Sequence, residues 1–396
     1  MITSDSAPEQ AGASPVDELL AAVAEHLGRP LPPPYEEAVR AVPRHLFLPS
    51  LLWLRDGAGG YAPRDRTADP EAWMRAAYAD ATLVTRFTDG LPSCAASMPS
   101  MVLRTLLLAG PAPRRPVLEL GTGTGFSAGL LAALVGDDHV TTVEIDPALA
   151  AQAEVNLKSA RRGPLVATAD AAGGWAPGGP YDRVVATFSV DRVPPAWIEQ
   201  TRLGGRIVTP WTSAWCSYGT LALSTGPGGT ARGRFHPFAS FMPMRTPQLQ
   251  GADGAHAAAV SDRAGVTAST GLSPWAVAGG DLDAEFHIGL SVPGASFAWD
   301  TSGEHAHTRL HISDTTSLSW AGVDYDGRRS DRFAVTQTGP RALWDEVVSA
   351  YGRWEELGRP GVDRYRLNVD PDGTQTVSAA VDGPRDVLVC TLPPAA

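Results

Sequence analysis

Cysteine is scarce in this chain of 396 residues. The three cysteines, Cys94, Cys216 and Cys390, are odd in number and lie far apart. This spacing offers neither a disulfide framework nor a cysteine pair for a metal site. Histidines gather only at 305–311, where no cysteine or carboxylate stands at the spacing of metal ligands. We therefore predict that the protein has no metal site.

Runs of positive charge and long apolar runs are also missing. The formal net charge is −11, and lysine and arginine form no run, which argues against a surface that follows nucleic-acid phosphates. No stretch approaches the roughly 18 apolar residues that cross a bilayer. The N-terminus is acidic and lacks the basic and apolar regions of a signal peptide. We expect a cytoplasmic protein with no nucleic-acid or membrane partner.

The composition is that of a folded protein, with 43% apolar and 19% charged residues. The length suits two domains, each with its own core. Residues 1–14 have the composition of a disordered leader. Apolar residues at helical spacing then predict a helix over 16–28 and a second helix that Pro43 ends.

Between these helices and residue 115 the signals are mixed. The stretch 56–69 is rich in Gly, Arg, Asp and Pro and predicts a loop. A short helix is expected over 73–78, and Pro99 is expected to begin another helix. The first hundred residues therefore predict a small helical subdomain.

From residue 115 onward, strands and helices alternate. An apolar strand at 116–120, a Gly-rich turn, a helix at 126–136 and a strand at 139–146 form a βαβ unit. Further strands are predicted at 165–170, 181–189 and 205–210, and further helices at 147–160 and 194–203. This alternation predicts an α/β fold with a doubly wound, largely parallel sheet that ends near residue 225.

Beyond residue 225 the helical signal weakens and short β segments recur. Glycine, threonine and arginine at 224–234 mark a linker or hairpin. One helix, at 341–358, interrupts the β segments and carries an amphipathic stripe. We predict a C-terminal, mostly-β (α+β) domain.

A glycine-rich turn is the most informative segment. Gly121, Gly123 and Gly125 stand between a buried strand and a helix start, where glycine lets the backbone approach a ligand. Such a turn can bind a pyrophosphate, or the adenosine of S-adenosylmethionine. Glu119 on the strand favours the second ligand, because the sulfonium and amino groups are cationic. Thr122 completes the predicted binding turn.

Two further acids stand at the ends of the next strands, where ligands bind in such sheets. Glu144, followed by Ile145, is placed to accept the ribose hydroxyls of an adenosine. Asp170, followed by Ala171, is placed to accept the adenine amino group, although an acid there is also a common helix cap. Together with the glycine turn, these residues predict S-adenosylmethionine as the cofactor.

Five separated motifs give the chain a resemblance to the protein-L-isoaspartate O-methyltransferase family over roughly residues 35–215. They are VPRHLFLP at 42–49, YAD at 78–80, LELGTGTGF with VEID at 118–146, PYDRVVATFSV after Asp170, and LGGRIVTP at 203–210. The resemblance implies a Rossmann-like class I methyltransferase fold and a peptide carboxylate as the methyl acceptor. The family's reactive loop is threonine-isoleucine-serine-x-proline, and its serine contacts that carboxylate.

The chain departs from the family in two places. Its reactive loop is CAASMP, so Ser97 and Pro99 match while Ala95 and Ala96 replace the threonine and isoleucine. The family's repair enzymes consist of little more than the methyltransferase domain, whereas this chain continues for about 170 residues beyond it. The tail looks like that of a subgroup that tailors ribosomally made peptides such as graspetides, lanthipeptides and lasso peptides.

The resemblance implies roles for residues of the substrate pocket. Ser97 is the predicted carboxylate contact, with a helix cap as its alternative. Asp80 and Ser93 are further catalytic candidates, with loop structure as the alternative for each. His45 is expected to be a packed, hydrogen-bonded histidine rather than a catalytic one. Arg44 is a candidate contact for the substrate carboxylate.

These inferences divide the chain into four predicted regions. They are a disordered leader (1–14), a helical and substrate-loop region (15–110), a cofactor-binding core (111–225) and a β-rich substrate-recognition extension (226–396). The predicted function is methylation of an aspartate side chain in a ribosomally made, modified peptide, leading to an aspartimide and in some cases to isoaspartate. Repair of aged isoaspartyl proteins is the alternative. A monomer is expected, with the modified precursor peptide as its partner.

Overall fold

The computed structural model describes residues 14–57, 59–245, 265–301, 308–314, 316–325, 331–381 and 386–392. The chain divides into two compact units, residues 1–169 and 170–396. The predicted boundary near residue 225 instead falls between two strands of the second unit, β10 (Thr220–Thr225) and β11 (Ala231–His236). The four predicted regions remain a prediction, and the predicted leader lies almost wholly outside the described residues.

The first unit begins with helices, as predicted. Its elements are α1 (Pro15–Leu27), α2 (Pro33–Ala41), η1 (Arg44–Phe47), β1 (Leu51–Arg55), β2 (Tyr61–Asp65), α3 (Pro70–Ala77), β3 (Leu83–Thr88), β4 (Leu91–Ala96) and α4 (Pro99–Ala109). Ser14 caps α1 by accepting a hydrogen bond from Asp17 N–H. Helix α2 ends just before Pro43, and α4 begins at Pro99, because proline suits the first turn of a helix and breaks its interior.

The N-terminal region also contains a four-stranded sheet that we did not predict. Its strands lie in the order β2-β1-β3-β4, and all neighbouring pairs are antiparallel. The predicted loop at 56–69 is therefore wrong, because Tyr61–Asp65 pairs with β1. Strand β2 is an edge strand with no buried residue, so it lacks the apolar alternation that identifies a strand in a sequence. The subdomain is helical as expected, but not helical only.

The second half of the first unit has the predicted alternation. Its elements are β5 (Val117–Leu120), α5 (Phe126–Val135), η2 (Asp137–His139), β6 (Val140–Glu144), α6 (Pro147–Ser159) and β7 (Leu165–Thr168). Strand β6 pairs in parallel with β5 and with β7. All residues of β5 and β6 are buried, which explains their continuous apolar character. The ends of these parallel strands meet at one edge, where the predicted cofactor residues stand.

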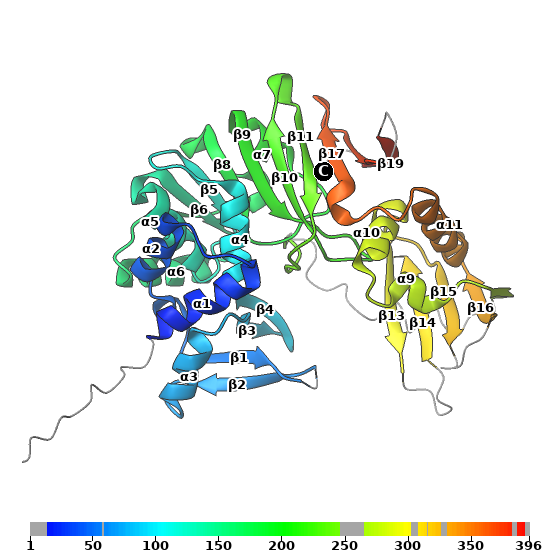
Figure 1. Cartoon of the computed structure of the whole chain (residues 1–396), viewed down its shortest axis with the longest axis horizontal. Coiled ribbons are helices and arrows are strands. Elements are labelled where there is room, and N and C mark those ends of the chain that lie inside the picture. Colours follow the sequence, from blue (N-terminus) through cyan, green and yellow to red (C-terminus); the bar gives the residue numbers. More distant parts are fainter. Residues whose placement is uncertain are drawn as a thin grey trace, which may run out of the picture. The chain divides into compact units, whose positions relative to one another are not determined.

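The second unit contains a mixed sheet and a smaller antiparallel sheet (Figure 1). The strands that this unit contributes to the mixed sheet are β8 (Tyr181–Ala186), β9 (Thr201–Pro210), β10, β11, β17 (Tyr365–Val369), β18 (Gln375–Ala379) and β19 (Val387–Leu392). The same part of the chain contains the helix α7 (Pro195–Glu199) and the short helices η3 (Ala171–Gly173), η4 (Ala176–Gly178), η5 (Pro227–Gly229) and η6 (Val362–Arg364). Strands β8 and β9 are parallel, and the later neighbours are antiparallel. For the segment 224–234, predicted to be a linker or a hairpin, the structure shows the hairpin, which joins β10 to β11.

The smaller sheet has the order β12-β16-β15-β14-β13. Its elements are β12 (Val266–Thr270), α9 (Pro274–Ala278), α10 (Leu282–Ser291), β13 (Ala295–Asp300), β14 (Thr308–Asp314), β15 (Trp320–Tyr325), β16 (Phe333–Thr338) and α11 (Leu343–Glu356). All three helices contribute to one apolar core with the sheet. Helix α11 was predicted, but α9 and α10 were not, so the expectation of a single helix is wrong. Residues 284–290 of α10 are all buried, which removes the amphipathic pattern.

The described residues contain no helix long and apolar enough to span a membrane. Within the same residues, no cluster of three or more His, Cys, Asp or Glu side chains is placed to hold a metal ion. Most of the histidine cluster at 305–311, including His305 and His307, lies outside the described part of the chain.

Candidate active site

The glycine-rich turn leaves β5 and enters α5 with an unusual backbone. Gly121, Gly123 and Gly125 have φ angles of 95°, 54° and 93°, a region that side chains disfavour. We call residues 119–125 together with Glu144 the cofactor turn. Its glycines are thus required by the turn itself, and they leave backbone N–H groups near the start of α5, where an anionic or polar ligand group binds favourably.

Glu144 joins the glycine turn to the end of β6. One of its carboxylate oxygens accepts a hydrogen bond of 2.9 Å from Gly123 N–H, and the other accepts one of 3.2 Å from Asp146 N–H. The backbone of β7 reaches the same point, because Ala169 N–H donates to the Glu144 carbonyl at 3.0 Å. Each carboxylate oxygen keeps acceptor capacity beyond these bonds. Glu144 is therefore held in place and can still accept hydroxyl donors.

Glu119 is a carboxylate buried beneath the turn, with no exposed surface. Its Oε2 accepts a hydrogen bond of 2.7 Å from the Thr142 hydroxyl, whereas Oε1 has no hydrogen-bond partner among the described residues. Burial raises the pKa of Glu119 to about 7, against the opposing effect of nearby hydroxyls. An unpaired buried carboxylate oxygen is costly, so the residue fits a cationic donor such as the amino group of S-adenosylmethionine.

The other predicted cofactor residues differ in how far the structure connects them. The Thr122 hydroxyl lies 2.6 Å from the Thr142 hydroxyl and so belongs to the Glu119 network. Ile145 is half-buried just after β6. Asp170 accepts a bond from Ala172 N–H and caps the short turn that begins at Ala171. This cap is the alternative role considered above, so adenine binding by Asp170 and Ala171 stays a prediction.

The reactive loop continues strand β4, and we call residues 91–97 the substrate strand. Along it Ser93, Ala95 and Ser97 are partly exposed, whereas Cys94 and Ala96 are buried. Such alternation places Ser93, Ala95 and Ser97 on one face of the strand. The face that carries Ser97 is therefore lined by small side chains.

Ser97 does not cap helix α4. The N-cap residue is Met98, which has no side-chain capping bond. Asp80 supplies the cap instead, since its Oδ1 accepts a hydrogen bond of 2.8 Å from Ser100 N–H. Among the described residues the Ser97 hydroxyl has no recorded partner, and the side chain is half-buried. The capping alternative for Ser97 is thus wrong, and its hydroxyl is available to a ligand.

Asp80 and Ser93 both make structural bonds. Asp80 is largely buried, and besides its cap its Oδ2 lies 3.9 Å from His26 Nδ1. The Ser93 hydroxyl accepts a bond of 2.8 Å from the Thr88 hydroxyl and one of 3.3 Å from Arg86 Nε. These bonds agree with the loop-structure alternative for each residue. A direct catalytic role for either stays a prediction.

Arg44 and His45 lie on η1. The Arg44 guanidinium is 1% exposed and donates to four backbone carbonyls, so the expected contact with a substrate carboxylate is wrong. Burial lowers the pKa of Arg44 to about 10, and the group keeps its charge at neutral pH. His45 shares a hydrogen bond of 2.8 Å with the Tyr78 hydroxyl, which agrees with the packed histidine that we expected.

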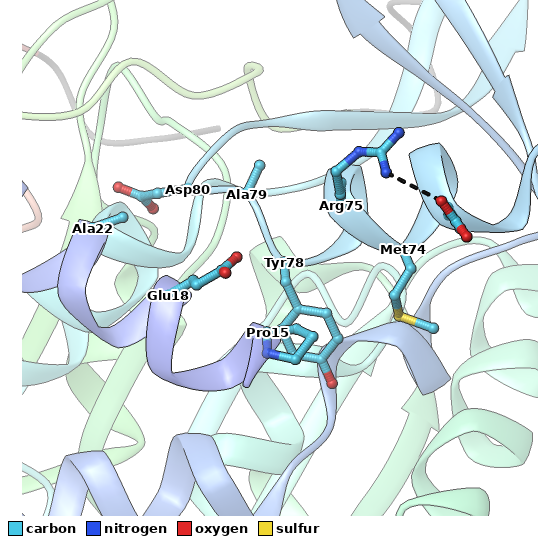
Figure 2. A pocket seen from close by; sticks show the side chains of 9 residues that line it. Pro15, Glu18, Ala22, Met74, Arg75, Tyr78, Ala79 and Asp80 are labelled. Carbon is cyan, nitrogen blue, oxygen red and sulfur yellow. Dashed lines mark ion pairs between the residues drawn. The ribbon is translucent and has the colours of Figure 1, made fainter. Parts of the chain in front are cut away.

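A pocket of about 530 Å³ is lined in part by the YAD motif at 78–80. Figure 2 shows its lining, in which α1 faces the end of α3 and the YAD motif. The residues are Pro15, Glu18, Ala22, Glu71, Met74, Arg75, Tyr78, Ala79 and Asp80. Arg75 pairs with Glu71 at 3.7 Å (Figure 2). No residue of the cofactor turn or of the substrate strand lines this pocket.

One connection between the two halves of the site was not predicted. Arg86 of β3 forms an ion pair of 2.7 Å with Asp146, two residues beyond Glu144. Asp146 also caps α6 by accepting bonds from Ala148 and Leu149 N–H. The sequence carries the cap signal for Asp146, but nothing in it pairs that residue with an arginine sixty positions earlier.

Comparisons with known proteins place the chain in a family. The family model described as Protein-L-isoaspartate(D-aspartate) O-methyltransferase (PCMT) matches residues 62–216. The protein named Protein-L-isoaspartate O-methyltransferase from Methanopyrus kandleri is 34% identical over 211 residues, which cover 52% of this chain and 81% of that protein. The protein of the same name from Gloeobacter violaceus is 32% identical over 183 residues, 46% of this chain and 85% of that protein.

A solved structure extends the likeness in fold to most of the molecule. A chain named protein-L-isoaspartate O-methyltransferase aligns with a TM-score of 0.54 and 18% identity, covering 92% of this chain and all of that chain. One chain of that name therefore has a fold that extends beyond the core, so the expectation that such proteins consist of little more than the methyltransferase domain does not hold for all of them. The Rossmann-like methyltransferase fold is confirmed. The chain belongs to the protein-L-isoaspartate O-methyltransferase family and is an S-adenosylmethionine-dependent carboxyl methyltransferase.

Proposed function

We propose that the protein methylates the side-chain carboxylate of an aspartate-type residue in a ribosomally made, modified peptide. The observation that carries the proposal is the face of the substrate strand on which Ala95 replaces the larger threonine expected from the family resemblance. Ser97 stands on the same face, and its half-buried hydroxyl makes no hydrogen bond within the described residues. A free hydroxyl beside a small side chain suits a carboxylate brought in by a bulky or constrained peptide.

The chemistry requires alignment more than proton transfer. S-adenosylmethionine supplies an electrophilic methyl group. The acceptor carboxylate is already anionic at neutral pH, so no general base is needed. Ser97 orients this carboxylate as a neutral donor, which avoids stabilising the charged ground state too strongly. Holding the reactants in line accounts for roughly 7–11 kcal/mol of barrier reduction in well-oriented systems.

The cofactor turn supplies the binding groups for the cofactor. We assign the cationic amino group to Glu119, whose Oε1 is buried without a partner among the described residues. We assign the ribose hydroxyls to Glu144. The backbone of Gly121 and Gly123, with Asp170 for the adenine amino group, completes the assignment. Metal ions have no part in the proposal.

The product is a methyl ester that reacts further within the peptide. The backbone nitrogen that follows the aspartate attacks the ester carbonyl, and methanol leaves as the carbon–nitrogen bond forms. The nitrogen loses its proton, and the resulting aspartimide has one water less than the starting peptide. Hydrolysis of that ring gives aspartate or isoaspartate. We further propose that the enzyme acts as a monomer in the cytoplasm.

Repair of isoaspartyl proteins is the second candidate. It is favoured by the name that the Methanopyrus and Gloeobacter relatives share. The two candidates use the same cofactor turn and the same Ser97, so they differ only in which peptide is accepted.

Mass spectrometry of intact peptides separates the candidates. The full chain and S-adenosylmethionine are incubated with a ring-containing precursor peptide that has an internal aspartate, and separately with a linear isoaspartyl peptide. Peptide tailoring predicts a gain of one methylene and then a net loss of one water on the first peptide only. Methylation of the isoaspartyl peptide alone would establish repair and contradict the tailoring proposal.

A further inference from the structure

Arg44 lies at a junction of three segments that are separate in the sequence. Its Nη1 donates to the carbonyls of Ala77 and Ala79 at 3.0 and 2.8 Å, and its Nη2 donates to those of Ala81 and Ser97 at 3.0 and 3.1 Å. One planar guanidinium thus holds the YAD loop and the reactive loop together. No carboxylate takes a hydrogen bond from it among the described residues.

Arg44 and the residues beside it lie against helix α5. The Arg44 Cζ lies 5.9 Å from the ring centroid of Phe126, the first residue of α5 and the neighbour of Gly125. A side chain at Gly129 would come within 3.0 Å of Val42 and 3.1 Å of Phe47. The segment that carries Arg44 therefore packs against the helix that follows the cofactor turn, with little space to shift.

Two neighbouring bonds support the same loops. Tyr78 of the YAD motif shares its hydroxyl bond with His45, the residue after Arg44. Asp80 of that motif caps α4 through Ser100, three residues after Ser97. The YAD loop is therefore bonded both to η1 and to the start of α4. The Ser97 carbonyl is held by Arg44, and the N–H that Asp80 caps lies three residues later.

From this geometry we infer that Arg44 is a positioning residue for methyl transfer, which fixes Ser97 relative to the cofactor turn through the backbone of the reactive loop. It acts without touching the substrate. The inference rests on the proposed function, in which Ser97 is the contact for the substrate carboxylate. Lysine can replace the residue only in part, because an ammonium group has three donors on one atom and cannot span four carbonyls as a planar guanidinium does.

Amide hydrogen exchange tests the inference without any peptide substrate. In the full chain, Arg44→Met should raise exchange at least tenfold at Ala79, Ala81 and Ser100, whose N–H groups are all hydrogen-bonded. Arg44→Lys should give a smaller rise at the same amides. Exchange at Gly121 and Gly123 should stay unchanged. Arg40→Met is the control, because Arg40 is an exposed arginine whose ion pairs within the described part of the chain are with Asp17 and Glu36 alone.

Kinetics then test the positioning role. With a peptide that the parent enzyme methylates, Arg44→Lys should lower kcat about tenfold and Arg44→Met about 100-fold, since a misplacement of about 1 Å can cost that much. The dissociation constant of S-adenosylmethionine should change less than threefold. A kcat within twofold of the parent for folded Arg44→Lys, or unchanged exchange at residues 79, 81 and 100 in either variant, would overturn the inference. Failure of the parent to methylate any peptide would count against the proposed function alone, because the exchange result stands without it.

Discussion

The cofactor turn and the substrate strand are held in place by different kinds of contact. In the cofactor turn, acids at the ends of β5 and β6 meet glycine N–H groups and threonine hydroxyls of the same βαβ unit. In the substrate strand, Ser97 is fixed through its backbone by Arg44, which lies 53 positions earlier. The first region is thus specified by local pattern, and the second by one long-range guanidinium. Variants in each region should therefore change different steps of the reaction.

Ser97→Ala should show the largest effect, and it should change methyl transfer alone. Loss of the hydroxyl removes the donor that orients the substrate carboxylate, so kcat/KM should fall about 100-fold. The affinity for S-adenosylmethionine, measured by calorimetry, should not change. Ser159→Ala, which removes an exposed hydroxyl on α6, is the matched control. If Ser97→Ala keeps full activity, Ser97 is not the carboxylate contact.

Glu144→Gln should weaken cofactor binding and leave the rate of methyl transfer almost unchanged, the reverse of Ser97→Ala. Replacing one carboxylate oxygen by an amide group weakens the hydrogen bonds to the ribose hydroxyls. The expected loss of binding free energy is about 2 kcal/mol, which corresponds to roughly 30-fold weaker cofactor binding. The kcat at saturating cofactor should stay within about threefold of the parent. Glu154→Gln, on the exposed face of α6, is the control. Equal affinity in Glu144→Gln and the parent would remove Glu144 from the cofactor site.

Glu119 should make cofactor binding depend on pH. Its pKa of about 7 means that the carboxylate is mostly protonated at about pH 6 and mostly ionised at about pH 8. A cationic amino group is attracted by the ionised form, so affinity should rise about tenfold between these pH values. Calorimetry in two buffers should show protons released on binding near pH 7. In Glu119→Gln this pH dependence should disappear, and its persistence would contradict the assignment.

Glu119 should also make the free energy of unfolding of the cofactor-free protein depend on pH. Because burial raises the pKa of Glu119 above its ordinary value of 4.5, its contribution is fully present below about pH 4.5 and is lost as the pH rises through about 7. The free energy of unfolding of the parent should therefore decrease over this window by about 3 kcal/mol relative to Glu119→Gln. Chemical denaturation of both proteins at several pH values measures the difference.

Ala95→Thr should have the smallest effect and tests the substrate face directly. It restores the larger residue of the family's reactive loop beside Ser97. We expect kcat/KM for a ring-containing peptide to fall about fivefold, since a few extra atoms at a half-buried position cost about 1 kcal/mol. Activity on a linear peptide should change little. An equal fall on both peptides would show that this face does not select the substrate.

The cofactor half of the site was largely predictable, because its signals are local. Glycines at 121, 123 and 125, an acid before them and an acid at the next strand end follow from the needs of a tight turn and a cationic ligand. The parallel strands around them were predictable for the same reason, since strands buried on both faces are continuously apolar.

The substrate half was less predictable, because its contacts join distant segments. Arg44 was expected at the substrate, and only the structure places its guanidinium among backbone carbonyls. Asp80 caps a helix twenty residues later in place of Ser97. Strand β2 and helix α10 lack the one-sided apolar pattern that identifies such elements, the first because it is exposed and the second because it is buried all round.

The central claim is that this protein transfers a methyl group to a peptide carboxylate, and the stability of the product to base tests it most directly. The full chain is incubated with methyl-labelled S-adenosylmethionine and either an aspartate-containing peptide or its asparagine counterpart. We predict label on the first peptide only, released as methanol by mild alkali or during aspartimide formation. Label that resists alkali, or that also enters the asparagine peptide, would show that the acceptor is not the carboxylate and would contradict the account.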